Sequence, residues 1–312
     1  MWLGRCWDSK VISARPTRLR CLSQGNTRRN PLGKNVTRQS TDVAVSTLHD
    51  REAAFHDAWA SDTELSEILV RESFEAPTAM ENQFILQCMG DLKGKKLLDI
   101  GSGLGESSVY FALQGAEVTA VDVSPRMVNT ALDLGARFGV KLQGIVSVAE
   151  ILEVSPASYD LIYIANTIHH VQNRPALFAQ MQRALKPGGR FFSYDPLAYN
   201  PAINLYRRMA SAVRTPDESP LSTADLDSAR KYFRHVGHRE FWVSSLLLFV
   251  KYFLIDRVHP NEDRYWKRIL RETPLSLRWW MPLRTLDKFL TRIPLVRWLA
   301  WNMVMWGEKA AD

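Results

Sequence analysis

The sequence predicts an α/β fold built on a mostly parallel sheet, and two observations support this prediction. Between residues 96 and 197, short β-rich runs alternate with helical patterns, as in a parallel sheet with helices on both faces. A glycine-rich turn directly follows the first of these runs, at the edge where open α/β sheets bind ligands. With 312 residues, 46% of them hydrophobic, the chain can bury a sizeable core.

The strand and helix patterns follow one another in a regular order. Strands are expected at 96–101, 117–123, 142–148, 159–166 and 189–197, with helices at 106–115, 124–139 and 174–185. Ser124 is a suitable N-cap with Pro125 at the first helical position, and Lys186-Pro187-Gly188-Gly189 ends the last of these helices. Two helices are expected ahead of the sheet, at 46–74 and 78–89. Helices at 196–208 and 222–233 and a strand at 238–245 are expected after it.

The basic charge of the chain is concentrated at its two ends. Residues 1–40 carry nine Lys or Arg and one acid, residues 41–238 carry 18 and 24, and residues 239–311 carry 13 and 7. The acidic middle argues against a nucleic-acid partner. Residues 1–45 are expected to be a basic, disordered leader, either an organelle (mitochondrial) transit peptide or the product of an upstream start. Three sparse cysteines without metal-ligand spacing favour a reducing compartment, the cytoplasm or an organelle matrix.

Three glycines at alternate positions, Gly101, Gly103 and Gly105, follow the first predicted strand. Without a Cβ they let the backbone approach a ligand closely, and the next helix start offers unpaired N–H groups. Asp122 ends the second predicted strand, where a carboxylate can accept hydrogen bonds from two ribose hydroxyls. These features predict an adenosine-containing ligand. A dinucleotide is disfavoured, because Glu106 occupies the third glycine position of G-x-G-x-x-G.

Four motifs between 95 and 197 resemble those of class I S-adenosylmethionine-dependent methyltransferases, and most resemble the small-molecule branch that includes quinone and lipid methyltransferases. The matching segments are LLDIGSGLG, VTAVDVSPRMV, YDLIYIANTIHHV and ALKPGGRFF. The resemblance implies a Rossmann-like domain with a seven-stranded, mostly parallel sheet and helices on both faces. It further implies an N-terminal helical lid at 46–92 and the methyltransferase domain at 93–245. The residues beyond it are unusual for this fold and predict a Trp/Arg-rich helical extension at 246–312.

The resemblance also implies S-adenosylmethionine as the cofactor and no metal. It assigns cofactor binding to Asp99, Gly101, Ser102, Gly103, Gly105, Asp122, Val123, Met127, Ala149, Glu150 and Asn166. Asp122 is the ribose acid in this scheme, and Met127 is an adenine-side contact. His56, Asp57 and Trp59 belong to the lid, or simply pack within its helix. The family usually has an acid before the Ala149-Glu150 pair, whereas this chain has Val148, a loss of roughly 1–2 kcal/mol of cofactor binding if nothing replaces it.

Methyl transfer from a sulfonium mainly requires alignment of the acceptor and exclusion of water. A base helps only when the acceptor is protonated, and the candidates are His169, His170 and Asp195. The two histidines could instead cap the following helix or shape the pocket, and Asp195 could be pocket wall beside Tyr194. The expected function is methyl transfer to a small lipophilic acceptor, with oxygen favoured. The alternative, suggested by Val148, is an inactive cofactor-binding or membrane-associated scaffold.

Seven of the ten tryptophans lie between Trp242 and Trp306, among Arg and Leu residues. The longest apolar stretch of this region, 241–255, is too short and too polar to span a bilayer. Trp and Arg on short apolar helices are typical of the membrane–water interface. Two interpretations of this region therefore stay open: a soluble helical cap packed on the domain, or a dimer contact, on one side, and peripheral membrane contact on the other.

Overall fold

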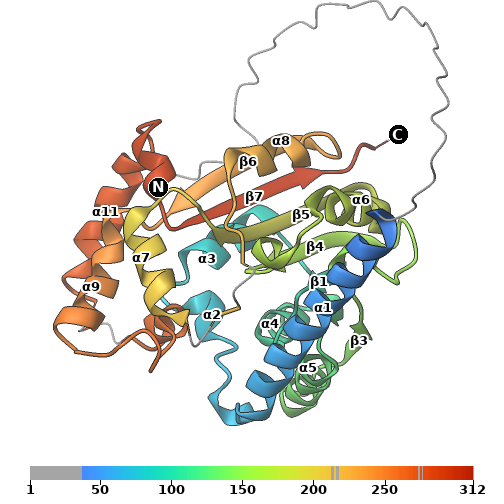
Figure 1. Ribbon diagram of the computed structural model, residues 1–312, viewed down its shortest axis with the longest axis horizontal. Helices are drawn as coiled ribbons and strands as arrows, with labels where there is room; N and C mark the ends of the chain where they lie inside the picture. Colours follow the sequence, from blue (N-terminus) through green and yellow to red (C-terminus); the bar gives the residue numbers. More distant parts are fainter. Residues whose placement is uncertain (1–36, 212–213, 216–217, 273–274, 276, 312) are drawn as a thin grey trace, which may run out of the picture.

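The computed structural model describes the backbone of residues 37–211, 214–215, 218–272, 275 and 277–311, and side chains from residue 49 onward. It is a central sheet with helices packed on both faces (Figure 1). Most of the predicted leader, up to residue 36, lies outside the described residues. Helix α1 (Thr37–Ser61) starts within the segment that the sequence analysis assigned to the leader.

The sheet has seven strands in the order β3-β2-β1-β4-β5-β7-β6. The first five strands of this order run parallel, and β7 is antiparallel to both of its neighbours. This confirms the predicted seven-stranded, mostly parallel sheet. The strands are β1 (Lys96–Ile100), β2 (Glu117–Asp122), β3 (Leu142–Val146), β4 (Tyr159–Ala165), β5 (Leu185–Pro196), β6 (Arg234–Phe241) and β7 (Asn302–Glu308).

Helices cover the two faces of the sheet unequally. One face packs against α3 (Met80–Met89), α4 (Glu106–Leu113) and α5 (Pro125–Arg137), and the other packs against α6 (Arg174–Ala184) and α8 (Thr223–Ala229). The predicted cap of α5 is present, because Ser124 Oγ accepts the N–H of Met127 at 3.0 Å. The remaining helices are α2 (Glu72–Glu75), α7 (Pro201–Met209), α9 (Leu247–Leu254), α10 (Tyr265–Arg268) and α11 (Trp280–Leu290).

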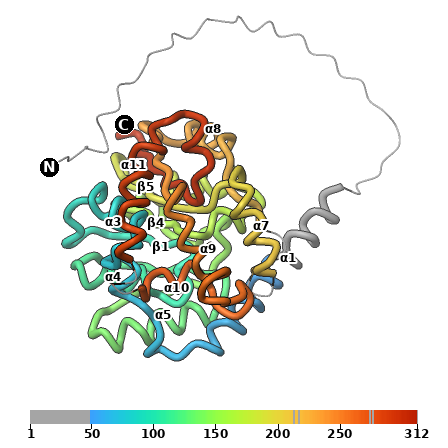
Figure 2. Tube along the Cα trace, turned by 90° about the vertical axis from the view of Figure 1, so that its left-hand side faces the viewer, coloured from blue at the N-terminus to red at the C-terminus, as the bar shows by residue number. Residues whose placement is uncertain are grey.

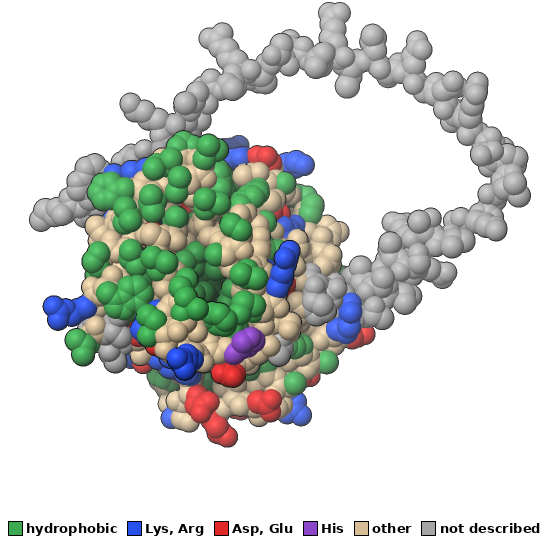
Figure 3. Space-filling model, turned by 60° about the vertical axis from the view of Figure 1, so that its left-hand side comes forward, with side chains coloured by type: hydrophobic (Ala, Val, Ile, Leu, Met, Phe, Trp, Pro, Cys, Tyr) green, Lys and Arg blue, Asp and Glu red, His purple; other side chains and the backbone are tan. Residues whose placement is uncertain are grey.

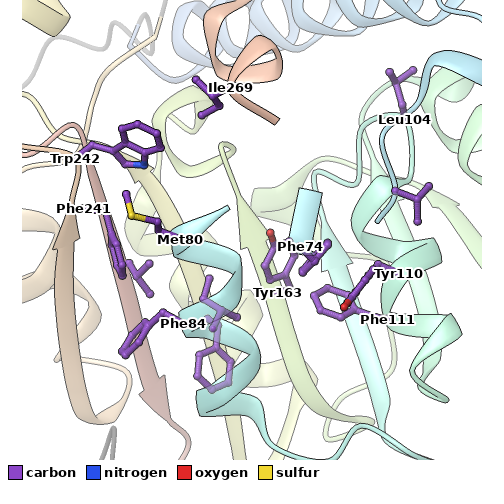
Figure 4. Close-up of a cluster of buried hydrophobic side chains, with 14 of the residues drawn as sticks. Phe74, Met80, Phe84, Leu104, Tyr110, Phe111, Tyr163, Phe241, Trp242 and Ile269 are labelled. Carbon is purple, nitrogen blue, oxygen red and sulfur yellow. The ribbon is translucent and has the colours of Figure 1, made fainter. Parts of the chain in front are cut away.

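The helices ahead of β1 are anchored in the main core. Phe74 of α2 stacks on Tyr110 of α4, with 4.1 Å between ring centroids, and Phe111 meets Tyr163 of β4 edge-on at 4.9 Å. Figure 4 shows these aromatic side chains together beside α3. Aromatic packing of this kind adds to the stability from burial alone. The N-terminal segment is therefore held firmly against the carboxyl edge of the sheet.

The predicted helical extension at 246–312 needs a correction, because its end forms strand β7. Met303 and Met305 face one core cluster of the sheet, and Val304 and Trp306 face the other. A strand buried on both faces is apolar throughout and lacks the alternation that marks a half-exposed strand. The sheet thus takes a strand from beyond the predicted domain boundary at 245. Among the described residues, no helix combines the length and the apolar character needed to cross a bilayer.

Candidate active site

The glycine turn between β1 and α4 borders a cavity at the carboxyl edge of the sheet. An added Cβ on Gly101 (φ 69°) would lie 2.1 Å from Thr167 Oγ1, and one on Gly105 (φ 93°) would lie 2.6 Å from Ala131 Cα. Gly103 (φ 54°) has no atom within 4 Å of that position and lines the cavity. Gly101 and Gly105 therefore allow the turn to pack tightly, whereas Gly103 exposes backbone to a ligand.

Asp122, at the end of β2, faces the same cavity. Its two carboxylate oxygens accept the N–H groups of Gly103 and Ser124, each at 3.0 Å. Burial raises the pKa of Asp122, and the charge of His56 and these two backbone hydrogen bonds oppose that rise. The carboxylate is thus fixed in place and retains lone pairs for hydroxyl groups. Val123 lines the cavity beside it.

Asp99 lies beneath the turn, outside the cavity lining. It is buried and accepts a hydrogen bond from Ser108 Oγ at 2.6 Å. Burial raises the pKa of Asp99 to about 7, and the nearby carboxylates of Asp122 and Glu106 add to the rise. Glu106 itself pairs with Lys267 Nζ at 3.2 Å. Asp99 therefore supports the turn from below, without a direct contact to the cavity.

The turn after β3 lines the cavity with Val148, Ala149 and Glu150. Val148 provides no acceptor at the position where the family has an acid. The carboxylate of Glu150 lies nearby, 3.7 Å from His49 Nε2 of α1. Glu150 is thus the one of these three side chains that offers an acceptor to a ligand.

Two further predicted residues differ in their placement. Asn166 follows β4 with φ 51°, lines the cavity, and donates its N–H to the carbonyl of Tyr194 at 2.8 Å. A positive φ at a residue other than glycine is uncommon and recurs at functional sites. Met127 instead is fully buried and is not among the cavity-lining residues. The N-cap turns the first turn of α5 so that Met127 faces the core, so the predicted adenine-side contact does not fit this position.

Helix α1 covers the cavity and is held by contacts with the start of α5 and with Arg264. Asp57 accepts hydrogen bonds from Ser124 Oγ at 2.5 Å and from the N–H of Arg126 at 3.2 Å. A carboxylate at the N-terminus of α5 is also favoured by the helix dipole. Trp59 lines the cavity and carries the guanidinium of Arg264 3.7 Å from its ring centroid. These contacts hold α1 over the cavity, and its role as a lid stays a prediction.

His169 and Asp195 form a buried pair in the cavity wall. Asp195 Oδ1 lies 2.7 Å from His169 Nδ1 and accepts the His169 N–H at 3.2 Å. Burial holds the pKa of His169 well below its usual range, and the charge of nearby His170 acts in the same direction. The contact with Asp195 fixes the orientation of the His169 ring in the cavity wall.

His170, His56 and Glu52 form a second cluster where α1 meets the turn after β4. Glu52 Oε2 lies 3.3 Å from His170 Nδ1 and 3.5 Å from His56 Nε2. Burial alone would raise the pKa of Glu52, but the hydrogen bonds with the two histidines outweigh it and hold the pKa well below its usual range. The ligand atoms of this cluster lie within 4.8 Å of one another, as do those of His169, His170 and Glu218, so either group could hold a metal ion. The expectation of no metal stays a prediction.

The far end of the cavity holds a buried carboxyl group that the sequence analysis missed. Glu81 of α3 and Asn302 of β7 are 6% and 4% exposed, and Asn302 Nδ2 donates to Glu81 Oε1 at 2.6 Å. Burial raises the pKa of Glu81. Next to it, Asn82 Oδ1 accepts a hydrogen bond from the Tyr163 hydroxyl at 2.7 Å. An acid in the first turn of a helix is common, so nothing in the sequence marked Glu81 as a cavity residue.

These groups line one cavity of about 310 Å³. Gly101, Ser102, Gly103, Asp122 and the turn after β3 lie on its lining, together with Asn166, His169 and His170, whereas Gly105 does not. Glu81, Asn302 and Tyr194 also line it, with apolar walls from Ile269, Leu270 and Trp301. The cavity thus offers nucleoside-type contacts at the ends of β1 and β2, and a buried carboxyl group, Glu81, among apolar and polar side chains near β7.

Comparison with known proteins supports the interpretation of this cavity as a cofactor site. A family profile described as "Methyltransferase domain" matches residues 98–193. Phosphoethanolamine N-methyltransferase 3 of Arabidopsis thaliana is 34% identical over 128 residues, 40% of this chain and 26% of that protein. Ubiquinone biosynthesis O-methyltransferase of Xylella fastidiosa (strain 9a5c) is 35% identical over 102 residues, 32% of this chain and 42% of that protein. The chain therefore spans less than half the length of these curated relatives.

Solved structures share the fold at low sequence identity. A putative sarcosine dimethylglycine methyltransferase from Galdieria sulphuraria aligns with a TM-score of 0.52 and 16% identity, over 84% of this chain and 98% of that one. Phosphoethanolamine N-methyltransferase 2 of Haemonchus contortus aligns with a TM-score of 0.50 and 20% identity, over 75% of this chain and 53% of that one. The matched profile, the sheet order and the turn geometry agree that residues 98–193 belong to a methyltransferase domain.

Proposed function

We propose that this protein transfers a methyl group from S-adenosylmethionine to a hydroxyl oxygen of a small, lipophilic acceptor. The observation that carries the proposal is the composition of the cavity. Gly103 and Asp122 line it at the ends of β1 and β2, and the buried pair of Glu81 and Asn302 lines it near β7, among apolar and polar side chains. Relatives named for O-methylation and for N-methylation both match the domain, so the preference for oxygen rests on Glu81.

The residues at the ends of β1 and β2 fit the cofactor. When bound, S-adenosylmethionine supplies an electrophilic methyl group on a sulfonium centre. The open backbone at Gly103 can approach its amino-acid portion, and the fixed carboxylate of Asp122 can accept the ribose hydroxyls. Glu150 can take the place of the acceptor that Val148 lacks, because its carboxylate lines the same part of the cavity.

The apolar residues of the lining and Glu81 fit a hydroxylated acceptor. Ile269, Leu270 and Trp301 favour a hydrophobic body, and the carboxylate of Glu81 can accept the hydroxyl proton while the oxygen gains the methyl carbon. Its raised pKa makes Glu81 a stronger base than an exposed carboxylate. Asn302 holds the Glu81 side chain in one orientation, and the lid helix α1 excludes water from the cavity.

The test is methyl transfer from labelled S-adenosylmethionine to an alkylcatechol and to the matching alkylaniline. Wild-type protein is expected to methylate the catechol faster. Glu81→Gln is expected to lower kcat for the catechol about 100-fold, the lower range for loss of a general base, without a change in affinity for S-adenosylhomocysteine. Glu240→Gln is the control, because Glu240 is equally buried but pairs with Arg297 outside the cavity lining. Equal rates for Glu81→Gln and wild type would remove the proposed role of Glu81.

The lipophilic acceptor also motivates a proposal of peripheral membrane contact, since such molecules concentrate in bilayers. The second candidate function is a scaffold that binds the cofactor without turnover, for which the missing acceptor at Val148 is the motivation. It predicts binding of S-adenosylmethionine with no labelled product from any acceptor, including a total lipid extract.

A further inference from the structure

The outer surface of the C-terminal segment carries a concentration of exposed apolar side chains. Within the part of the chain that the structure describes, thirteen of the eighteen large hydrophobic side chains that are exposed lie between residues 247 and 299. We call this set the apolar face. Its most exposed members are Leu254, Ile255, Leu275, Phe289 and Leu295, which is 84% exposed.

Seven of the thirteen side chains of the apolar face lie on two helices, α9 and α11, and the other six lie in the segments that adjoin these helices in the chain. Helices α9 and α11 lie side by side at one end of the protein in both ribbon and tube views (Figures 1 and 2). Seen from that end, hydrophobic side chains form a broad, nearly continuous surface with a hollow within it (Figure 3). Contiguous exposed apolar surfaces of this kind mark sites of protein or membrane interaction.

The fold does not need these outward side chains. The same segment packs on the domain through its inward residues, which include the fully buried Trp242, Tyr252 and Trp280. Asp287 on α11 is also turned inward, where it accepts hydrogen bonds from Ser244 and Ser245. The soluble-cap interpretation therefore accounts for the tryptophans that point inward, and leaves the aliphatic outer surface without a partner among the described residues.

The charges around the apolar face have one sign. Residues 247–299 contain 11 basic and 5 acidic residues, a net charge of +6. The imbalance is larger at the surface of the described part: Glu262 is the exposed acid, whereas five basic side chains are exposed, Arg257, Arg271, Arg278, Lys288 and Arg292. A surface that combines apolar and basic side chains complements an anionic lipid bilayer.

We propose that the apolar face docks on a membrane surface that contains anionic lipids. A second copy of this chain fits less well, because a symmetric contact would bring the same basic side chains of both copies together. The docking is interfacial, since none of the described helices could span the bilayer. Hydrophobic side chains enter the headgroup region, and the exposed arginines and lysine meet lipid phosphates.

A groove in the apolar face supports this proposal. It has a volume of about 310 Å³ and is lined by Leu247, Val250, Leu254, Ile255, Trp279 and Lys251. Five of the six side chains are apolar, and the ammonium group of Lys251 lies at the groove, 2.8 Å from Asp256. A groove of this composition suits part of a hydrocarbon chain below a charged headgroup.

The same segment reaches the active-site cavity, because Trp266, Ile269 and Leu270 are among its lining residues. A lipophilic acceptor could therefore pass from the bilayer to the cavity along one structural unit. This link rests on the proposed function. The docking itself does not, and it is measurable without any methyl acceptor.

The test is flotation of the full chain with phosphatidylcholine vesicles that either lack or contain about one third phosphatidylglycerol. We expect the protein to float with the anionic vesicles, and salt to weaken this binding. The double variant Ile255→Asp/Leu295→Asp is expected to lose at least nine tenths of the bound fraction. Ile151→Asp is the matched control, because Ile151 is 68% exposed but lies outside the apolar face.

The affinity of each variant for S-adenosylhomocysteine, and its thermal unfolding, separate the outcomes. Loss of vesicle binding with unchanged cofactor affinity and unchanged unfolding supports docking through this face. Absence of wild-type binding to both kinds of vesicle would overturn the proposal, and so would equal binding by the double variant. A wild-type dimer in sedimentation that the double variant abolishes, without vesicle binding, would assign the face to a second copy. Failure of cofactor binding alone would count against the proposed function and not against the docking.

Discussion

Replacing Gly103 by alanine separates the ligand role of the glycine turn from its structural role. Gly103 has φ 54°, and a Cβ there would meet no atom within 4 Å. The substitution therefore costs only backbone strain, about 1–2 kcal/mol for a left-handed residue. At roughly 2–4 °C per kcal/mol for a domain of this size, the midpoint of thermal unfolding should fall by a few degrees. The new methyl group, however, points into the cavity, where the ligand must approach the protein backbone at this position.

Gly94 provides a matched control for this prediction. It has φ 70°, a Cβ there also meets nothing within 4 Å, and it lies outside the cavity lining. Titration calorimetry with S-adenosylhomocysteine should show an affinity loss of at least about tenfold for Gly103→Ala, equivalent to about 1.4 kcal/mol, and none for Gly94→Ala. Both variants should show similar losses of thermal stability. Equal affinity of the two variants would refute the assignment of the turn as the ligand site.

Three further predictions follow from the site. Gly105→Ala should destabilise the fold by more than Gly103→Ala does, because its Cβ would lie 2.6 Å from Ala131 Cα, and urea unfolding measures the difference. Burial raises the pKa of Asp99 from 3.8 to about 7, so its contribution to stability is complete below about pH 4 and is lost as the pH rises through about 7. Between these pH limits, the free energy of unfolding of Asp99→Asn should rise above that of wild type by up to about 4 kcal/mol. Unfolding curves of the two proteins with the same pH dependence would contradict this. Asp57→Ala should release α1 from Ser124. It should weaken binding of S-adenosylhomocysteine several-fold and change the midpoint of thermal unfolding little. An unchanged dissociation rate of S-adenosylhomocysteine would count against α1 as a lid.

The parallel part of the sheet could be predicted from the sequence because its signals are local. Each of β1, β2 and β4 is an apolar run followed by a turn residue, and the capped start of α5 is marked by Ser124 and Pro125. The placement of Gly103 and Asp122 at the cavity was likewise predictable, because cavities at the edge of such a sheet are lined by residues within a few positions of a strand end.

The features that could not be predicted depend on contacts between segments that are distant in the sequence. Strand β7 pairs with β6 although the whole α9–α11 region separates them in the chain, and its uniform apolarity matches a buried helix equally well. Glu81 becomes a cavity residue only because α3 packs beside β7 and brings Asn302 to its carboxyl group. Met127 faces the core for a similar reason, since the N-cap sets the orientation of the first turn of α5.

Binding of the cofactor to the wild-type chain and to Asp122→Ala tests the central claim most directly. In titration calorimetry, S-adenosylmethionine and S-adenosylhomocysteine should both bind the folded wild-type protein. Asp122→Ala should lower both affinities by well over tenfold, because it removes the carboxylate held by Gly103 and Ser124. Wild-type protein that binds neither compound, or an Asp122→Ala variant that binds them as tightly as wild type, would contradict the account.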